Sequence, residues 1–195
     1  VSLNGASYFA WSCLRPLAGT EKDQQSICIS KLTTPTSIDS ASIGVISQPD
    51  QPWEQVGTEA VPAVNEGPNP LYWAGETYIT YSASYCGTAS YSIGLLRYTG
   101  GDPVDPASWS KKKDGPVFSS NNGEYGTGHN GIFLSPDESQ VWNVFHAVTN
   151  PQGSCGTDRA TFALQLNTTN FDPAVGPIFG AIPPPDTVLP GPSGE

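Results

Sequence analysis

A strand-rich unit recurs along this chain at intervals of about 65 to 70 residues, and this repeat restricts the possible folds more than any other feature. Equivalent positions in the three copies are Phe9, Ile79 and Val144, which are 70 and 65 residues apart. Each copy reads as a strand, a second strand, a turn and a shorter third strand. Repeats of this length, each forming a small antiparallel sheet, are typical of β-propeller blades.

The expected strands are short, and Gly, Pro, Asn and Asp separate them. Their ranges are 8–14, 26–32 and 43–47, then 75–84, 91–99 and 115–119, then 140–148, 160–166 and 176–179. The two faces of strand 75–84 are expected to carry Tyr78, Thr80 and Ser82, and Ile79, Tyr81 and Ala83, respectively. Segment 105–109 is predicted to be a turn, and no helical periodicity of useful length is present.

Three such units predict an all-β fold with about three blades of a β-propeller. Because propellers close with about four to eight blades, residues 1–195 are expected to form a single incomplete domain. An open ring leaves sheet faces bare, so a second chain, an N-terminal fragment or a symmetry mate is expected to supply the missing blades. A β-sandwich is the competing fold, and the repeat length argues against it. The proline-rich segment 181–195 is predicted to be an extended tail over the surface.

The charge of the chain restricts its partners. A net charge of −10 and a pI of about 4.4 disfavour nucleic acid and anionic membranes, so a neutral ligand such as a sugar fits better. No segment approaches the roughly 18 apolar residues of a membrane-spanning helix. The lysine run 111–113 is expected to be a solvated turn.

The cysteines indicate a secreted protein. Cys13, Cys28, Cys86 and Cys155 form an even set without the CxxC spacing of zinc sites, so two disulfides are expected. Cys13 and Cys28 lie on neighbouring predicted strands and are expected to pair. Asn167 begins an N-glycosylation sequon, which is compatible with secretion.

Glu66 is the first candidate catalytic residue. It follows an apolar run and precedes Gly67, Pro68 and Pro70, which restrict the backbone. Rigid backbone on both sides can hold one carboxylate in one place, as an acid catalyst requires. The alternative is an ordinary loop carboxylate.

Three further residues can carry chemistry. His129 lies in a glycine-rich turn before a strand at 132–134, where it can approach a ligand or ion, or hydrogen-bond the loop backbone. His146 lies within a core strand and is expected to be structural. Arg159 follows a Gly/Cys loop and can either clamp a sugar hydroxyl or pair with Asp158. The chain lacks Gly-x-Ser-x-Gly, a phosphate loop and helical metal-ligand pairs, which argues against serine hydrolases, nucleotide enzymes and zincins.

Taken together, these motifs resemble the C-terminal part of glycoside hydrolase family 43, the five-bladed propeller arabinofuranosidases, arabinanases and xylosidases. The likeness is greatest to secreted exo-acting α-L-arabinofuranosidases. The matching segments, in family order, are Leu3-Asn4-Gly5 with Trp11-Ser12, Asn65-Glu66-Gly67-Pro68, Tyr81-Ser82-Ala83-Ser84 with Cys86, Gly94-Leu95-Leu96, Asp105-Pro106-Ala107-Ser108-Trp109, Tyr125-Gly126 with Gly128-His129-Asn130, His146-Ala147, and Asp158-Arg159.

The resemblance implies an inverting glycosidase with Glu66 as the general acid. In this mechanism an opposing carboxylate, roughly 6.5–9.5 Å away, activates water. By the same likeness His129 lies near the propeller axis, beside substrate and a calcium or sodium ion that is not required for the chemistry. Arg159 is similar to a substrate-contacting arginine, and Cys86 is expected to pair with Cys155 at the active-site end. No nucleotide or redox cofactor is implied.

The chain also departs from the family pattern. The family's general base and its second aspartate, which tunes the acid, would both lie upstream of Val1, and Asp23, Asp39 and Asp50 do not match their motifs. Segment 160–163 lacks an arginine that relatives carry, which leaves the sugar open. We therefore expect a hydrolase of arabinan or arabinoxylan in hemicellulose that is inactive as this chain alone. The alternatives are a non-catalytic, lectin-like carbohydrate-binding protein, or a β-xylosidase or endo-arabinanase.

Overall fold

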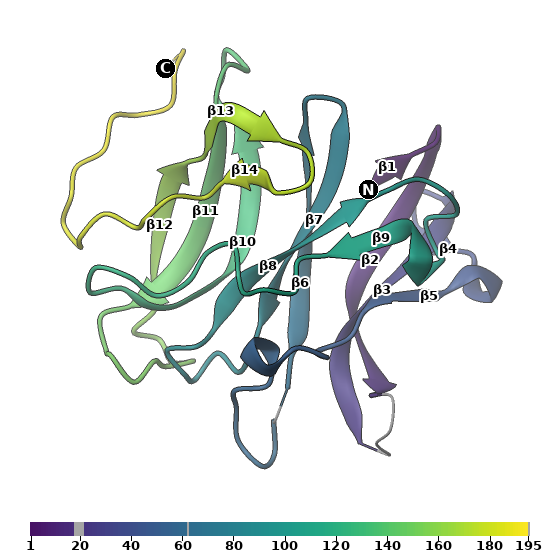
Figure 1. Cartoon of the computed structure of the whole chain (residues 1–195), viewed down its shortest axis with the longest axis horizontal. Helices are drawn as coiled ribbons and strands as arrows, with labels where there is room; N and C mark the ends of the chain where they lie inside the picture. The colour runs from purple at the N-terminus through teal and green to yellow at the C-terminus, as the bar shows by residue number, and fades with distance from the viewer. Residues whose placement is uncertain (18–21, 62, 195) are drawn as a thin grey trace.

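The computed structural model describes residues 1–17, 22–61 and 63–194. Within these ranges the regular structure is β-strand, apart from three short 3₁₀ helices (Figure 1). The strands are β1 (Ser2–Leu3), β2 (Ala6–Pro16), β3 (Asp23–Thr34), β4 (Ser37–Ile38), β5 (Gly44–Ser47), β6 (Asn65–Trp73), β7 (Glu76–Ala83), β8 (Ser92–Tyr98), β9 (Trp109–Lys111), β10 (Tyr125–Leu134), β11 (Val141–Val148), β12 (Ala160–Gln165), β13 (Asn167–Asp172) and β14 (Gly176–Ile178). The 3₁₀ helices are η1 (Ser40–Ser42), η2 (Pro52–Glu54) and η3 (Pro106–Ser108). The expected all-β fold is therefore confirmed.

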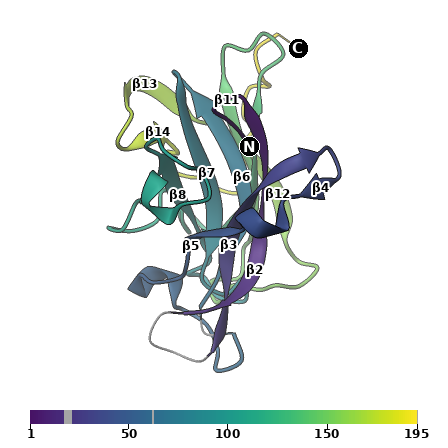
Figure 2. The same ribbon diagram turned by 90° about the vertical axis from the view of Figure 1, so that its right-hand side faces the viewer.

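Three antiparallel sheets lie side by side, and a small hairpin of β13 and β14 flanks them. The first sheet has the order β1-β2-β3-β4, with β5 also paired to β3, the second is β6-β7-β8-β9, and the third is β10-β11-β12. The second sheet lies between the other two (Figure 1), and Figure 2 looks onto the side formed by the first sheet. Within each main path, strands adjacent in the sequence pair in the sheet, as expected for propeller blades.

The second sheet has apolar neighbours on both faces, and β7 shows why. Ile79, Tyr81 and Ala83 pack in one cluster with residues of the first sheet, whereas Tyr78 packs in another cluster with residues of the third. The alternation predicted for this strand is confirmed, because residues on its two faces pack in different clusters. All six residues from 78 to 83 are buried. The core is thus two apolar layers with the second sheet between them.

The predicted repeat boundaries are wrong by one strand in the second and third units. Each of these sheets begins one strand earlier than expected, with β6 and β10. β6 is interrupted by two prolines and a glycine and β10 by three glycines, and both strands carry β-bulges, so the apolar alternation that marks a strand is missing. Segment 115–119 is not a regular strand, since Phe118 forms an isolated bridge with Ile93 and β9 takes the fourth place.

Both expected disulfide pairs are present. Cys13–Cys28 joins β2 to β3, and Cys86–Cys155 joins the β7–β8 loop to the β11–β12 loop. The helices in the described residues are too short and too polar to cross a membrane.

The described part of the tail, residues 181–194, contains no strand or helix but is anchored at both ends. Ile182 is buried in the core between the second and third sheets, and its carbonyl accepts a hydrogen bond from Asn122 Nδ2 at 2.6 Å. At the other end Ser193 Oγ donates to Asp137 Oδ2 at 2.5 Å. Glu195 lies outside the described residues.

Glu124 is a buried carboxylate under this tail and leads to a pH-dependent prediction. Its side chain is 1% exposed and lines a cavity of about 210 Å³ together with Phe145, Phe162 and Asp186. Among the described residues Glu124 Oε2 has no hydrogen-bond partner, and burial raises the pKa of Glu124 from 4.5 to about 6. The charged form is thus disfavoured in the folded state.

We expect Glu124→Gln to stabilise the protein at alkaline but not at acidic pH. Because the folded-state pKa exceeds the unfolded value, the wild type loses stability as pH rises from 4.5 through 6, by about 1–2 kcal/mol in total. Urea unfolding at pH 4.5 and pH 8 measures this difference. Glu59→Gln, at an exposed position, is the control. An equal effect of Glu124→Gln at both pH values would contradict the prediction.

Candidate active site

Glu66 lies at the start of β6, half-buried, where the strand leaves regular pairing. It pairs with Ser82 of β7, and a bulge follows before Asn69 pairs with Thr80. Gly67 within the bulge has φ +57°, a conformation that glycine adopts without strain, and its N–H donates to Ser12 Oγ at 3.0 Å. The bulge changes the direction of the chain next to the carboxylate, as bulges beside functional sites often do.

Tyr91 holds the Glu66 carboxylate. Its hydroxyl donates a hydrogen bond of 2.7 Å to Glu66 Oε1, and its ring is buried. Burial, and secondarily the Glu66 charge, raises the pKa of Tyr91 well above its usual value, so the phenol keeps its proton and remains a donor. The sequence does not identify Tyr91 as a site residue, since a single tyrosine at the start of a predicted strand carries no motif.

His129 lies beside this carboxylate on β10. A Cβ atom placed on Gly67 would lie 3.2 Å from His129 Nε2, so the imidazole packs directly on the glycine that follows Glu66. His129 is exposed and has φ +49°, which is strained for a residue other than glycine, and its N–H donates to Ser82 Oγ at 2.6 Å. Strain of this kind is concentrated at functional sites. The expected glycine-rich turn is instead a bulged part of a long strand.

His146 stacks between two aromatic neighbours. Its ring lies 6.0 Å from that of His129 and 6.2 Å from that of Tyr91, both nearly parallel. Burial, then the charge of Arg159, then His129, lowers the pKa of His146 to about 4. The neutral imidazole accepts a hydrogen bond at Nδ1 from Arg159 Nε. This packing agrees with the structural role expected for it.

Arg159 directs all five of its N–H groups at protein acceptors. Besides His146 Nδ1, the acceptors are the backbone carbonyls of Cys86, Gly126, His146 and Ser154. Its guanidinium also lies 5.5 Å from the centre of the Tyr91 ring. The expected alternative partner, Asp158, accepts from Ser154 Oγ at 2.8 Å and forms no ion pair with Arg159 within the described residues. Arg159 therefore clamps loops around the cluster.

The structure thus brings all four sequence candidates into one cluster with Tyr91. The cluster offers one carboxylate, which can give or take a proton, and a hydrogen-bond donor that orients it. Asp39 and Asp50 do not belong to this cluster. Asp39 caps η1, and Asp50 forms an ion pair with Lys111. His129 supplies a single imidazole, and no group of three or more His, Cys, Asp or Glu in the described ranges is arranged for a metal ion, so we derive no step through one.

Comparison with known proteins decides the family. The family model described as glycosyl hydrolases family 43 matches residues 1–170, which include the whole cluster. The chain belongs to glycosyl hydrolase family 43. Its α-L-arabinofuranosidase B relative from Pyricularia oryzae is 39% identical over 152 residues, which are 74% of this chain and 29% of that protein. An extracellular exo-α-(1→5)-L-arabinofuranosidase from Streptomyces avermitilis is 36% identical over 147 residues, covering 74% and 28%.

Solved family structures agree with this assignment. The α-L-arabinofuranosidase from Lactobacillus brevis superimposes with a TM-score of 0.77 at 27% identity, covering 94% of this chain and 55% of that one. A thermostable family-43 glycoside hydrolase gives 0.71 at 25% identity, covering 96% and 59%. This family-43 chain therefore spans less than a third of those curated relatives and somewhat more than half of these solved chains.

Proposed function

We propose that this chain supplies the C-terminal blades and the general acid, Glu66, of a secreted inverting α-L-arabinofuranosidase. The observation that carries the proposal is the hydrogen bond from Tyr91 to Glu66 Oε1, made at a bulge within the family-43 match. Arabinofuranosidase relatives supply the substrate class. The substrate would be a neutral cell-wall polysaccharide such as arabinan or arabinoxylan, which the charge of −10 does not repel.

In the proposed reaction Glu66 protonates the glycosidic oxygen as the bond to the sugar breaks. A second carboxylate on the opposite face takes a proton from the attacking water, and inversion requires roughly 6.5–9.5 Å between the two groups. This second carboxylate comes from outside residues 1–195. Tyr91 orients Glu66, the exposed His129 contacts the sugar, and Arg159 acts by holding Tyr91 and His146 in place.

We also propose that further blades complete a five-bladed ring. The chain contributes three sheets, and propellers need at least about four blades to close. Strand β2 of the first sheet has an uncovered apolar face, where Phe9 is 51% exposed and stacks on Trp11. An adjacent blade, from N-terminal residues or a second chain, would cover this side.

Secretion and glycosylation belong to the same proposal. The two disulfides suit an oxidising compartment, and relatives named extracellular point the same way. Asn167 is exposed at the start of β13, where a glycan has room. A calcium or sodium ion beside His129 remains a proposal from the family likeness, and the chemistry does not require it.

Product analysis tests the function. We expect the complete enzyme to release single arabinose units from arabinan or arabinoxylan, and proton NMR of early product to show an inverted anomeric centre. This chain alone is expected to release none. Xylose from xylan would indicate a β-xylosidase, and arabino-oligosaccharides an endo-arabinanase. Binding without any product from the complete protein would replace the proposal with a carbohydrate-binding protein.

A further inference from the structure

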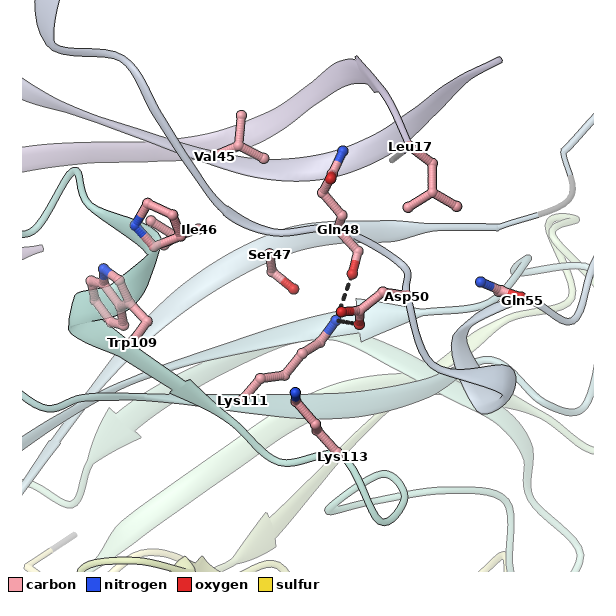
Figure 3. A pocket seen from close by; sticks show the side chains of 11 residues that line it. Leu17, Val45, Ile46, Ser47, Gln48, Asp50, Gln55, Trp109, Lys111 and Lys113 are labelled. Atoms are coloured by element: carbon pink, nitrogen blue, oxygen red, sulfur yellow. Dashed lines mark hydrogen bonds and ion pairs between the residues drawn. The ribbon is translucent and has the colours of Figure 1, made fainter. Parts of the chain in front are cut away.

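Lys111 is not the solvated turn residue that the lysine run suggested. It ends β9, and its side chain is only 10% exposed. It forms part of the wall of a cavity of about 550 Å³ between β5, η3 and β9 (Figure 3). None of Glu66, Tyr91 or His129 lines this cavity, so its chemistry differs from that of the active-site cluster.

The Lys111 ammonium is fully coordinated by protein groups. Nζ donates to Gln48 O at 2.6 Å, to Asp50 Oδ1 at 2.9 Å and to Glu54 Oε2 at 2.7 Å, which uses its three donors (Figure 3 shows the first two). A longer contact of 3.5 Å joins Nζ to Asn65 Oδ1. The position of the ammonium is therefore set mainly by three acceptors from η2 and from the segment that joins β5 to it.

Glu54 is the buried counter-charge and is equally saturated. Its side chain is 0% exposed. Oε1 accepts from Asn65 Nδ2 at 3.1 Å and from Tyr81 OH at 2.9 Å, while Oε2 accepts from Gln51 N at 2.9 Å and from Lys111. Four hydrogen bonds fill the capacity of a carboxylate. Glu54 thus has no free lone pair for chemistry, and its role is to hold its neighbours.

Asn65 connects this buried pair to the proposed acid. It immediately precedes Glu66 and is fully buried. Besides its bond to Glu54, its Nδ2 donates to Val64 O at 2.8 Å, and its Oδ1 accepts from Ser47 Oγ at 2.6 Å. Successive side chains of a strand point to opposite faces, so the Asn65 amide anchors one face of β6 while Glu66 projects from the other.

We propose that Lys111, Glu54 and Asn65 form a positioning network that fixes the backbone of β6 at Glu66. The proposal rests on the proposed function of Glu66. The network draws on β5 of the first sheet, on η2, and on β6, β7 and β9 of the second. The position of the acid is therefore coupled to the packing of the first sheet against the second. A misplacement of about 1 Å can cost about 10²-fold in rate.

The test uses Asn65→Ala in the complete enzyme and two substrates that differ in their need for an acid. We expect kcat on arabinan to fall about 30- to 100-fold, with KM changed less than about threefold. On 4-nitrophenyl α-L-arabinofuranoside, whose leaving group departs without protonation, kcat is expected to fall less than about threefold. A purely structural role would slow both substrates equally, and that result overturns the proposal.

Two further variants keep the outcome decisive. Glu76→Gln breaks the half-exposed ion pair with Arg97 and is expected to change neither rate. If Asn65→Ala fails to fold, Tyr81→Phe removes one hydrogen bond to Glu54 and keeps the ring. In this variant kcat is expected to fall about three- to tenfold on arabinan alone. An equal fall in kcat on both substrates, or no fall on either, overturns the proposal. Normal arabinan turnover by Glu66→Gln would instead refute the proposed function.

Discussion

Replacing Glu66 by glutamine is expected to lower kcat on natural arabinofuranosyl linkages by about 10³-fold while sugar affinity stays nearly unchanged. Glutamine keeps the size of the side chain and can still accept the hydrogen bond from Tyr91, but it cannot deliver a proton to the leaving oxygen. General acid catalysis contributes typically about 10²–10⁴-fold, so nearly all turnover of an unactivated linkage depends on this group. Aryl arabinofuranosides with acidic leaving groups are expected to lose far less.

Steady-state kinetics on arabinan together with calorimetric titration of arabinose separates rate from affinity. Glu138→Gln, at an exposed position in the turn before β11, is the matched control and is expected to behave like the wild type. If Glu66→Gln turns over arabinan at the wild-type rate, Glu66 is not the general acid. A parallel loss of sugar affinity would mean that the carboxylate binds the substrate and does not act as an acid.

Removing the Cys86–Cys155 disulfide is expected to destabilise the protein by about 4 kcal/mol and to lower activity as well. The two cysteines are 69 residues apart, and a cross-link over a loop of this length stabilises by about 4 kcal/mol through the unfolded chain. The Cys86 and Ser154 carbonyls also accept hydrogen bonds from Arg159, which packs over Tyr91. Loss of the cross-link therefore frees the loops that hold Arg159, and through it Tyr91, the partner of Glu66.

Urea unfolding of Cys86→Ala/Cys155→Ala under non-reducing conditions measures the loss of free energy of unfolding. The Cys13→Ala/Cys28→Ala variant provides the scale, because its shorter separation of 15 residues predicts a smaller loss of about 3 kcal/mol. The reverse order of the two losses would contradict the loop-length argument. An unchanged kcat in Cys86→Ala/Cys155→Ala would show that Arg159 keeps its place without the disulfide.

Local patterns were sufficient for much of the fold. In β7 the residues assigned to each face from the sequence do lie on opposite faces, and the structure shows that both faces are buried from 78 to 83. The cysteine positions on β2 and β3 predicted a disulfide correctly because neighbouring strands bring them together. Patterns failed at β6 and β10, where glycine, proline and bulges replace alternation. These are the strands that carry Glu66 and His129, so local regularity is lost at the candidate site.

The order of the residues was enough to predict the all-β class, the repeat, the family likeness and the four candidates Glu66, His129, His146 and Arg159. Only the tertiary structure brought them together, added Tyr91, and revealed that Lys111 is buried against Glu54. The physical reason is that strand periodicity and turn residues are local properties. Tyr91 lies 25 residues from Glu66 and Cys86 lies 73 residues from Arg159, and only the packing of one sheet on another selects such distant partners.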